Sequence, residues 1–229
     1  MITLAVLDIA GTTVEEGGTV YRVLADVVAE HGPAAPDHEL RRWMGADKRA
    51  ALAALTGDPA ATEELHARFV ERLNAAYAAL PPVPVAGVPQ ALAQLRSNGV
   101  RVALTTGFDH AVTDPLLAAV GWRTGEHLDA VVCAEDVDAG RPSPDMIRRA
   151  MRLTGVTDPL SVVTAGDTVL DIQAGHAAGA GLVTGVLSGA QTRAELEREK
   201  PAEILESVAG LPALILSYRN GAGGSARPS

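Results

Sequence analysis

Five short apolar segments recur along the chain and are separated by helical patterns. They cover residues 4–8, 100–105, 130–133, 161–165 and 182–186. Uninterrupted apolar runs of this length are typical of strands that are buried on both faces of a parallel sheet. Apolar residues return at helical spacing in residues 88–95, just before the second run, and in residues 112–120 and 146–153, between later runs. Strands that alternate with helices predict an α/β fold with a doubly wound parallel sheet and right-handed crossovers.

The pattern changes between the first two predicted strands. Residues 20–80 show no strand pattern, but they carry several apolar stripes at helical spacing. Gly17-Gly18 and the proline-rich residues 81–84 flank this stretch and are typical hinge sequences. We therefore expect an all-helical domain inserted into the sheet domain.

These patterns set the expected domain boundaries. The core domain should comprise residues 1–16 and 85–218, and the inserted helical domain residues 17–84. The final segment, residues 219–229, is rich in glycine, serine and alanine. Such a composition predicts a disordered tail.

Composition and charge restrict the function classes. With 47% apolar and 21% charged residues in 229, the chain can bury a sizeable core. Its 19 basic and 28 acidic residues give a net charge of −9, which argues against a nucleic-acid partner. A single cysteine, Cys133, excludes an internal disulfide and suits a reducing compartment. With no export signal and no apolar membrane span in view, we expect a cytoplasmic protein without a membrane partner.

Polar side chains follow four of the predicted strands. Asp8 ends the first, Thr106 follows the second, Arg141 lies beyond the third, and Asp167 and Asp171 follow the fourth. Because ligands bind beyond the carboxyl ends of parallel strands, we expect these side chains to converge in one crevice. Asp171 lies four residues after Asp167, a spacing that places both on one helical face.

This set of residues suits metal-assisted phosphoryl transfer. Mg²⁺ prefers a few carboxylates together with water and phosphate oxygens, and Asp8 and Asp167 supply the carboxylates, with Asp171 in support. Arg141 and the Thr106 hydroxyl would stabilise charge on the transferring group. Asp8 would be the nucleophile that forms an aspartyl-phosphate.

The same residues resemble the motifs of the haloacid dehalogenase superfamily. The usual D-x-D-G-T motif reads Asp-Ile-Ala-Gly-Thr at residues 8–12, and G-D-x-x-x-D matches residues 166–171. The resemblance implies a Rossmann-like core, a mobile helical cap, a Mg²⁺ cofactor and a small phosphorylated or phosphonate substrate. It also implies that the metal is held by Asp8, the Ala10 carbonyl, Asp167 and Asp171, and that the substrate lies against Gly11, Thr12 and Gly107.

Ala10 stands where most phosphatases of the superfamily have an acid that protonates the leaving oxygen. Alanine at this position is similar to the phosphonatases, the phosphonoacetaldehyde hydrolases, whose cap carries an M-G-x-x-K motif. Met44-Gly-Ala-Asp-Lys48 matches that motif. Condensation of the Lys48 amine with an aldehyde would make an iminium, which accepts electrons from a broken carbon–phosphorus bond without an acid at Ala10. The resemblance thus predicts a phosphonatase-like hydrolase.

Three further phosphonatase positions differ in this chain. Ala51 replaces a histidine, Gly18 a cysteine and Phe108 a tyrosine. A different small substrate is therefore open, as is a phosphatase for small monoesters such as phosphoglycolate or a sugar phosphate, in which Lys48 only grips the substrate. A non-catalytic phosphate-sensing or interaction protein is a third alternative.

The remaining reactive side chains carry weaker signals. Cys133 has no assigned base and is expected in the core, while His110, His127 and His176 lack metal-ligand spacing among them. Residues 191–200 read as a solvated, charged helix. The oligomeric state stays open, with a homodimer among the alternatives.

Overall fold

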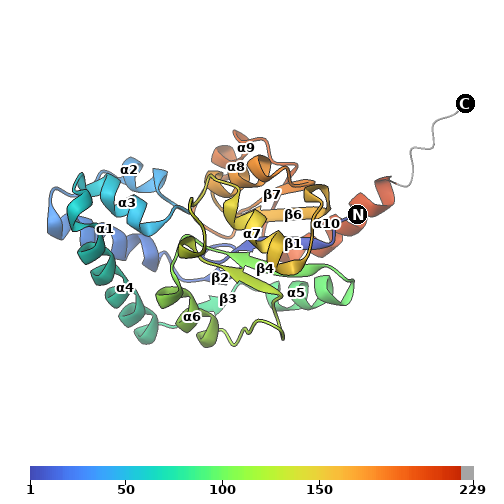
Figure 1. Cartoon of the computed structure of the whole chain (residues 1–229), viewed down its shortest axis with the longest axis horizontal. Helices are drawn as coiled ribbons and strands as arrows, with labels where there is room; N and C mark the ends of the chain where they lie inside the picture. The colour runs from blue at the N-terminus through green and yellow to red at the C-terminus, as the bar shows by residue number, and fades with distance from the viewer. Residues whose placement is uncertain (223–229) are drawn as a thin grey trace, which may run out of the picture.

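The computed structural model describes residues 1–222, and for residues 219–222 only the backbone. Its centre is a six-stranded, all-parallel sheet in the order β5-β4-β1-β6-β7-β8 (Figure 1). The strands are β1 (Leu4–Asp8), β4 (Arg101–Thr105), β5 (Ala130–Val132), β6 (Val162–Gly166), β7 (Leu182–Val186) and β8 (Glu203–Leu205). The predicted parallel α/β sheet is confirmed. The edge strand β8 was not predicted, because its three residues bury only Ile204.

Alternate residues of β1 enter two different cores, which is what a strand buried on both faces requires. Ala5 and Leu7 pack with α5 (Val88–Ser97), α6 (His110–Ala119) and α10 (Leu211–Ala222). Leu4 and Val6 pack with α7 (Asp145–Thr154) and α8 (Val169–Ala178). The sheet is therefore covered on both faces by helices.

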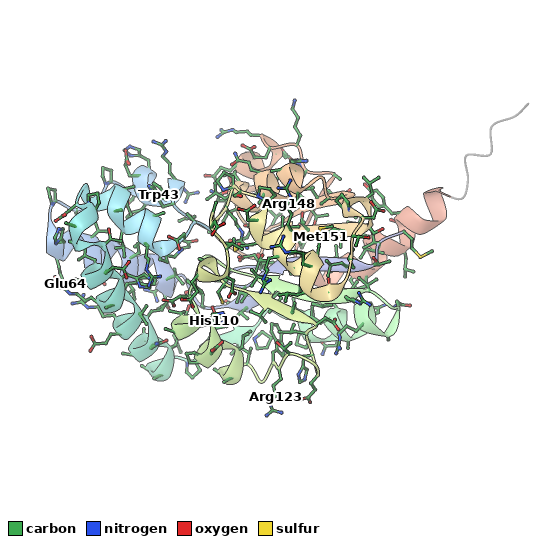
Figure 2. The ribbon with its side chains drawn as sticks, in the orientation of Figure 1. Trp43, Glu64, His110, Arg123, Arg148 and Met151 are labelled. Atoms are coloured by element: carbon green, nitrogen blue, oxygen red, sulfur yellow. The ribbon has the colours of Figure 1, made fainter. Side chains whose placement is uncertain are left out.

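Helix α7 shows how the apolar stripes set these contacts. Met151 is buried against the sheet, whereas Arg148, one turn earlier and outside the buried face, is exposed (Figure 2). Leu153, which the sequence pattern placed on the buried stripe, is half-exposed instead. Leu153 lies seven residues after Met146, in the last turn of α7. In that part of the helix, the buried side chains are Ala150, Met151 and Thr154.

The inserted segment is all helical, as the sequence pattern predicts. It contains α1 (Thr19–His31), α2 (Asp37–Arg42), α3 (Lys48–Thr56) and α4 (Thr62–Ala79), which lie together at one side of the sheet (Figure 1). Leu24, Leu52 and Phe69, from α1, α3 and α4, are fully buried and share one apolar cluster with the sheet domain.

The two connections to the insertion lie side by side. β2 (Val14–Glu15) and β3 (Val83–Pro84) pair as a short antiparallel ribbon. Just beyond it, Gly17 and Gly18 have φ values of 64° and 70°, a left-handed conformation that glycine adopts without strain. Both segments expected to be hinges therefore meet at one place.

The end of the chain departs from the expected tail. Helix α10 continues through Ala222, so residues 219–222 are helical rather than disordered. Leu211 and Ile215 are buried and anchor the start of this helix in the core. Once a helix has started, each added residue gains one backbone hydrogen bond, which favours its continuation. The rest of the expected tail, residues 223–229, lies outside the described residues. Among residues 1–222, no helix has the length and hydropathy that crossing a bilayer demands.

Phe69 allows a direct test of the core of the insertion. Phe69→Ala should lower the free energy of unfolding by about 3–5 kcal/mol, because a fully buried ring is replaced by a cavity. Leu80→Ala is the matched control: Leu80 is 71% exposed, so its truncation should change stability by less than about 0.5 kcal/mol. Urea denaturation measures both, and equal losses in the two variants would contradict the assigned packing.

Candidate active site

The candidate site lies at the carboxyl ends of β1, β4 and β6. Asp8 is the last residue of β1 and stands in register with Thr105 of β4, while Asp167 directly follows β6. Arg141 enters from the loop after β5. All the charged groups expected here are buried, namely Asp8, Arg141, Asp167 and Asp171. The parallel sheet therefore gathers side chains from positions up to 163 residues apart in the sequence, from Asp8 to Asp171.

Arg141 lies at the centre of this cluster. Its Nη1 donates to Asp8 Oδ1 at 2.6 Å, and its Nε lies 2.9 Å from Asp171 Oδ1. Its Nη2 donates to the Thr105 hydroxyl at 2.8 Å and to the Thr105 carbonyl at 3.0 Å. The sequence analysis did not identify Thr105 as a partner of Arg141, although its place beside Asp8 in the sheet follows from the strand register.

Asp167 is held by close backbone packing. The Thr12 hydroxyl donates to its Oδ1 at 3.0 Å, and the Ala190 N–H donates to its Oδ2 at 2.7 Å. A Cβ on Gly11 would lie 2.7 Å from that Oδ2, and a Cβ on Gly189 only 2.1 Å from it. Gly11 also has a φ of 85°. Glycine at both positions lets the backbone approach the carboxylate, and Thr12 orients it.

Asp171 reaches the cluster by a route that the sequence analysis did not foresee. Helix α8 begins only at Val169, so Asp167 precedes it and the two acids do not share a helical face. Instead, Asp171 occupies the third helical position of a capping box, where the Thr168 hydroxyl donates to its Oδ2 at 2.6 Å. Its other oxygen meets Arg141. The cap therefore aims the carboxylate at the guanidinium.

The cluster carries an excess of buried negative charge. Burial raises the pKa of Asp8, which Arg141 opposes and Asp171 reinforces. Burial also raises the pKa of Asp167, and the charges of Asp8 and Asp171 raise it further. Three carboxylates face one guanidinium, and carboxylate oxygens are the ligands that a hard divalent cation prefers. The residues present therefore fit Mg²⁺, whose charge would relieve this repulsion.

Lys48 reaches the site from the insertion. Its side chain is only 3% exposed, its Nζ donates to the Ala46 carbonyl at 2.7 Å, and the Phe108 ring centre lies 5.4 Å away. Burial lowers the pKa of Lys48 to about 8, an effect that the nearby Asp47 and Asp8 charges partly oppose and Arg141 adds to. A neutral amine is therefore accessible near physiological pH, which is what a nucleophilic lysine requires.

The loop that precedes Lys48 is pressed against the core. A Cβ on Gly107 would lie 2.3 Å from the Ala46 carbonyl oxygen, and a Cβ on Gly45 would lie 2.5 Å from the Thr168 hydroxyl. Arg141 Nη1 also donates to the Gly45 carbonyl at 3.3 Å. The insertion is therefore closed over the candidate site, and Gly45 and Gly107 make this approach sterically possible.

A second bridge joins the insertion to the core. Arg41, at the end of α2, donates to both carboxylate oxygens of Glu195 at 2.8 and 3.0 Å. This bond, together with those from Thr192, lowers the pKa of Glu195. The prediction of a solvated helix over residues 191–200 was therefore too simple. The helix is α9 (Arg193–Glu197), and its residue Glu195 forms a salt bridge with Arg41 of the insertion.

The predicted residue Thr106 shapes the loop beside Asp8. Its hydroxyl accepts a hydrogen bond from the Phe108 N–H at 3.2 Å, and its own N–H donates to the Val132 carbonyl at 3.1 Å. These bonds fix the turn that carries Gly107 under the insertion. Thr106 is buried next to Thr105, at the end of β4.

Tyr21 is a further site residue that the sequence analysis missed. Its hydroxyl accepts a hydrogen bond from the Gly45 N–H at 3.3 Å. Burial raises its pKa, and the charges of Asp167 and Asp8 raise it further. It lines a cavity of about 250 Å³ with Met44 and Asp167, among others. A single tyrosine inside an apolar helical stripe carries no sequence signal for such a role.

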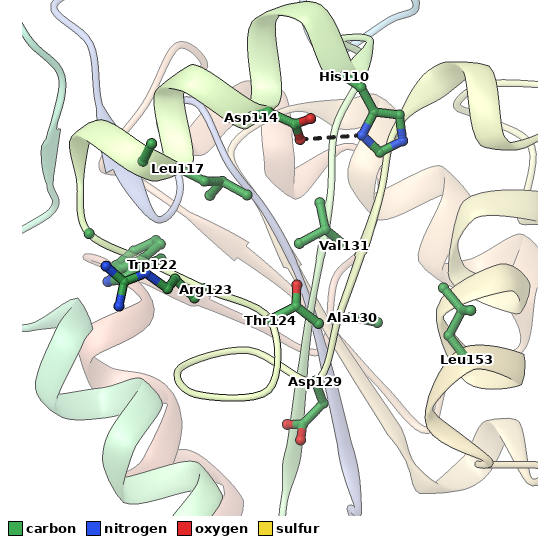
Figure 3. A pocket seen from close by; sticks show the side chains of 12 residues that line it. His110, Asp114, Leu117, Trp122, Arg123, Thr124, Asp129, Ala130, Val131 and Leu153 are labelled. Atoms are coloured by element: carbon green, nitrogen blue, oxygen red, sulfur yellow. Dashed lines mark hydrogen bonds and ion pairs between the residues drawn. The ribbon is translucent and has the colours of Figure 1, made fainter.

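A larger hollow lies away from these residues. It measures about 550 Å³ and sits over β5, between α6 and α7 (Figure 3). Its lining includes His110, Asp114 and Trp122 but none of the residues proposed for phosphoryl transfer. Size alone therefore does not mark the candidate active site, which is identified by its converging charged groups.

Comparisons with known proteins agree with this geometry. The model of the haloacid dehalogenase-like hydrolases matches residues 2–179. The phosphonoacetaldehyde hydrolase of Bacillus cereus is 30% identical over an alignment that covers 90% of this chain and 85% of that protein.

Solved structures show the same fold. A phosphonoacetaldehyde hydrolase-like protein from Oleispira antarctica has a TM-score of 0.82 at 20% identity, covering 99% of this chain and 96% of its own. A structure described as a predicted phosphoglycolate phosphatase, from Haemophilus somnus, has a TM-score of 0.73 at 19% identity, covering 93% and 98%. By its sequence match and its fold, this chain belongs to the haloacid dehalogenase-like hydrolases.

Proposed function

We propose that this hydrolase is a Mg²⁺-dependent, phosphonatase-like enzyme. It would remove the phosphoryl group from a small phosphonate, phosphonoacetaldehyde or an analogue, through an aspartyl-phosphate. The observation that carries the proposal is Lys48, a buried amine with a lowered pKa, which follows the loop of the insertion that contacts Arg141 and Gly107. Ala10 supports it, because alanine cannot protonate the leaving oxygen of a phosphate ester. The name of the Bacillus cereus relative supports the same reaction.

The chain supplies an electron sink and a nucleophile for this reaction. The Lys48 amine condenses with the substrate aldehyde, releases water and forms an iminium. Asp8 then attacks phosphorus, the carbon–phosphorus bond breaks, and its electron pair moves into the iminium to give an enamine. Water hydrolyses the aspartyl-phosphate to inorganic phosphate. Protonation and hydrolysis of the enamine return the free lysine and release the shortened aldehyde.

The remaining residues bind charge during the transfer. Arg141, held by Asp171 and Thr105, presents its guanidinium to the phosphoryl oxygens beside Asp8. The Thr106 hydroxyl would donate to the same oxygens, while Gly11, Thr12 and Gly107 form the surrounding backbone. Closure of the insertion excludes water from the iminium until transfer is complete.

The Mg²⁺ site that we propose uses Asp8, the Ala10 carbonyl and Asp167, with Asp171 in support. When bound, the ion would offset the charge repulsion between the acids and the incoming phosphonate. Asp167 is already oriented for this role by Thr12 and the Ala190 N–H.

The substrate need not be phosphonoacetaldehyde itself. The polar groups found at positions 18, 51 and 108 of phosphonatases are Gly18, Ala51 and Phe108 here. Tyr21 is instead one of the polar residues that line the cavity beside Asp167. We infer that the organic part of the substrate meets the Tyr21 phenol in place of those groups.

A phosphatase acting on a small phosphate monoester is the second candidate. The hydrogen bond from Lys48 to the Ala46 carbonyl favours it, because a lysine held in that way can bind substrate as a cation. A non-catalytic phosphate-sensing protein is a weaker alternative, because its fold would have no need for a nucleophile held as Asp8 is.

Removing the nucleophile should abolish turnover. Asp8→Asn should lower the rate of phosphate release to background, because no aspartyl-phosphate can form. Excess EDTA should do the same to the unmodified protein, with activity restored by Mg²⁺. Phosphate release and circular dichroism are the measurements. A folded Asp8→Asn variant that keeps its activity would overturn the mechanism.

The pH profile should report the amine of Lys48. Below a pKa of about 8 the amine is protonated and cannot attack an aldehyde, so kcat/KM should rise by about tenfold per pH unit up to that value and then level off. Borohydride added with phosphonoacetaldehyde should attach the reduced product to Lys48, as peptide mass spectrometry would show. The control, Lys48→Arg, keeps the charge and should lose both the adduct and carbon–phosphorus cleavage. Full carbon–phosphorus cleavage by Lys48→Arg would overturn the iminium route, and an unmodified protein that hydrolyses phosphate monoesters but no carbon–phosphorus bond would favour the phosphatase.

Closure of the insertion can be tested at a single glycine. Gly107→Ala should lower kcat/KM by about 100-fold, because its Cβ would push the Ala46 carbonyl, and with it Lys48, out of place. Gly32→Ala is the matched control, since no heavy atom lies within 4 Å of the Cβ it adds. Thermal unfolding should show both variants folded. Equal activity in the two would mean that the closed contact is not used in turnover.

A further inference from the structure

Three potential metal ligands converge beside the large hollow over β5. His110 begins α6, Cys133 directly follows β5, and Asp136 ends the short helix η2 (Ala134–Asp136). One ligand atom from each of the three lies within 4.8 Å of the other two. Cys133 Sγ is 3.6 Å from His110 Nδ1, and His110 Nε2 is 3.2 Å from both carboxylate oxygens of Asp136. The sequence spacing of the histidines gave no sign of this cluster, because its partners come from two separate loops.

The local backbone holds these side chains in place. The Cys133 N–H donates to Asp136 Oδ2 at 2.8 Å, and the His110 N–H donates to Glu135 Oε1 at 2.7 Å. The Ala134 N–H donates to the Phe108 carbonyl at 2.9 Å, which joins the two loops. The cysteine is fully buried and its sulfur faces the imidazole. The three groups are therefore set by the fold and are not merely neighbours on a mobile surface.

The surroundings of the cluster favour a cation. Asp114, Glu135 and Asp136 surround His110, and Asp114 Oδ1 lies 3.4 Å from its Nδ1 (Figure 3). His110 and Asp114 also line the hollow of about 550 Å³, so an ion can enter from solvent along that side. The site thus combines a negative environment, a thiol and an imidazole with an open approach.

We propose that Cys133, His110 and Asp136 form a second metal site, one that takes a thiophilic divalent cation such as Zn²⁺. Sulfur and imidazole nitrogen are the ligands that Zn²⁺ accepts in tetrahedral sites, and a carboxylate completes three positions. Asp114 or a water molecule would fill the fourth. Coordination replaces the thiol proton, which passes to the solvent.

The two metal sites select different ions by their donor atoms. Mg²⁺ binds oxygen ligands and dehydrates reluctantly, so it has no preference for the cluster at Cys133. The acids around Asp8 offer only oxygen. Cys133 follows β5, and Asp8 ends β1, with β4 between these strands. The second site is therefore separate from the catalytic cluster and does not depend on the function proposed for it.

An ion at this site would also act on the loop beside Asp8. His110 lies two residues after Phe108, whose ring is under the Lys48 ammonium. Coordination would join His110, at the start of α6, to Cys133, in the loop after β5. The turn that contains Phe108 would then be fixed both by this ion and by the hydrogen bond from the Ala134 N–H to the Phe108 carbonyl. The unfolding temperature should rise with the metal concentration, since the ion binds the folded chain only.

The single cysteine makes the test specific. Metal-free protein with excess Mg²⁺ is titrated with Co²⁺, and separately with Cd²⁺, while the ultraviolet thiolate-to-metal charge-transfer band is recorded. Cys133 is the chain's only thiol, so an ion bound by the acids at Asp8 gives no such band. We expect a saturable band in the unmodified protein, displaced by Zn²⁺, and no band in Cys133→Ser.

Two further variants test the other ligands. His110→Ala should weaken the metal affinity by at least the roughly 10–100-fold that loss of an outer partner costs, and it replaces a half-exposed side chain. Asp136→Asn should weaken the affinity in the same direction. His38→Ala is the control, because His38 is a solvent-exposed histidine of the insertion. Absence of a band in the unmodified protein, or an unchanged affinity in His110→Ala, would overturn the proposal.

Discussion

The contact of Arg141 with Asp8 and Asp171 is the interaction on which the candidate active site depends. Three buried carboxylates, at the end of β1, directly after β6 and in the first turn of α8, repel one another, and a buried charge is costly without a partner. The guanidinium supplies that partner through forked contacts to two of the acids and to Thr105. The third acid, Asp167, has other partners: the Thr12 hydroxyl and the Ala190 N–H bind its carboxylate, and Gly11 and Gly189 lie directly against it.

The insertion completes the site by steric fit more than by strong bonds. Its loop at Gly45 and Ala46 lies against Thr168 and Gly107 with no room for a side chain. The salt bridge from Arg41 to Glu195 lies farther from the acids and is partly exposed, so it contributes only about 0–1 kcal/mol. Weak closing contacts of this kind are compatible with the opening of the insertion that the proposed mechanism requires.

The sequence was sufficient to predict the parallel sheet and the residues at its carboxyl edge. The apolar runs identify the strands, and the polar residues directly after them lie at that edge because the strands are parallel. It did not show how Asp171 is positioned. The sequence analysis expected Asp167 and Asp171 on one helical face, whereas Asp171 is oriented by a capping box with Thr168 and Asp167 precedes the helix. It also missed Thr105 and Tyr21, whose roles come from strand register and from the packing of a hinge-side helix. The link from Glu195 to Arg41 was equally invisible, because it joins residues 154 positions apart through a surface contact.

The β2–β3 ribbon has a consequence for how the insertion can move. Both chain crossings pass through this one pair of strands, and backbone hydrogen bonds hold them together. Two separate flexible tethers would let the helices drift and twist in any direction. A single paired crossing restricts any rotation of the insertion to essentially one axis, so that the motion required by the proposed mechanism would return the loop that carries Lys48 to the same place.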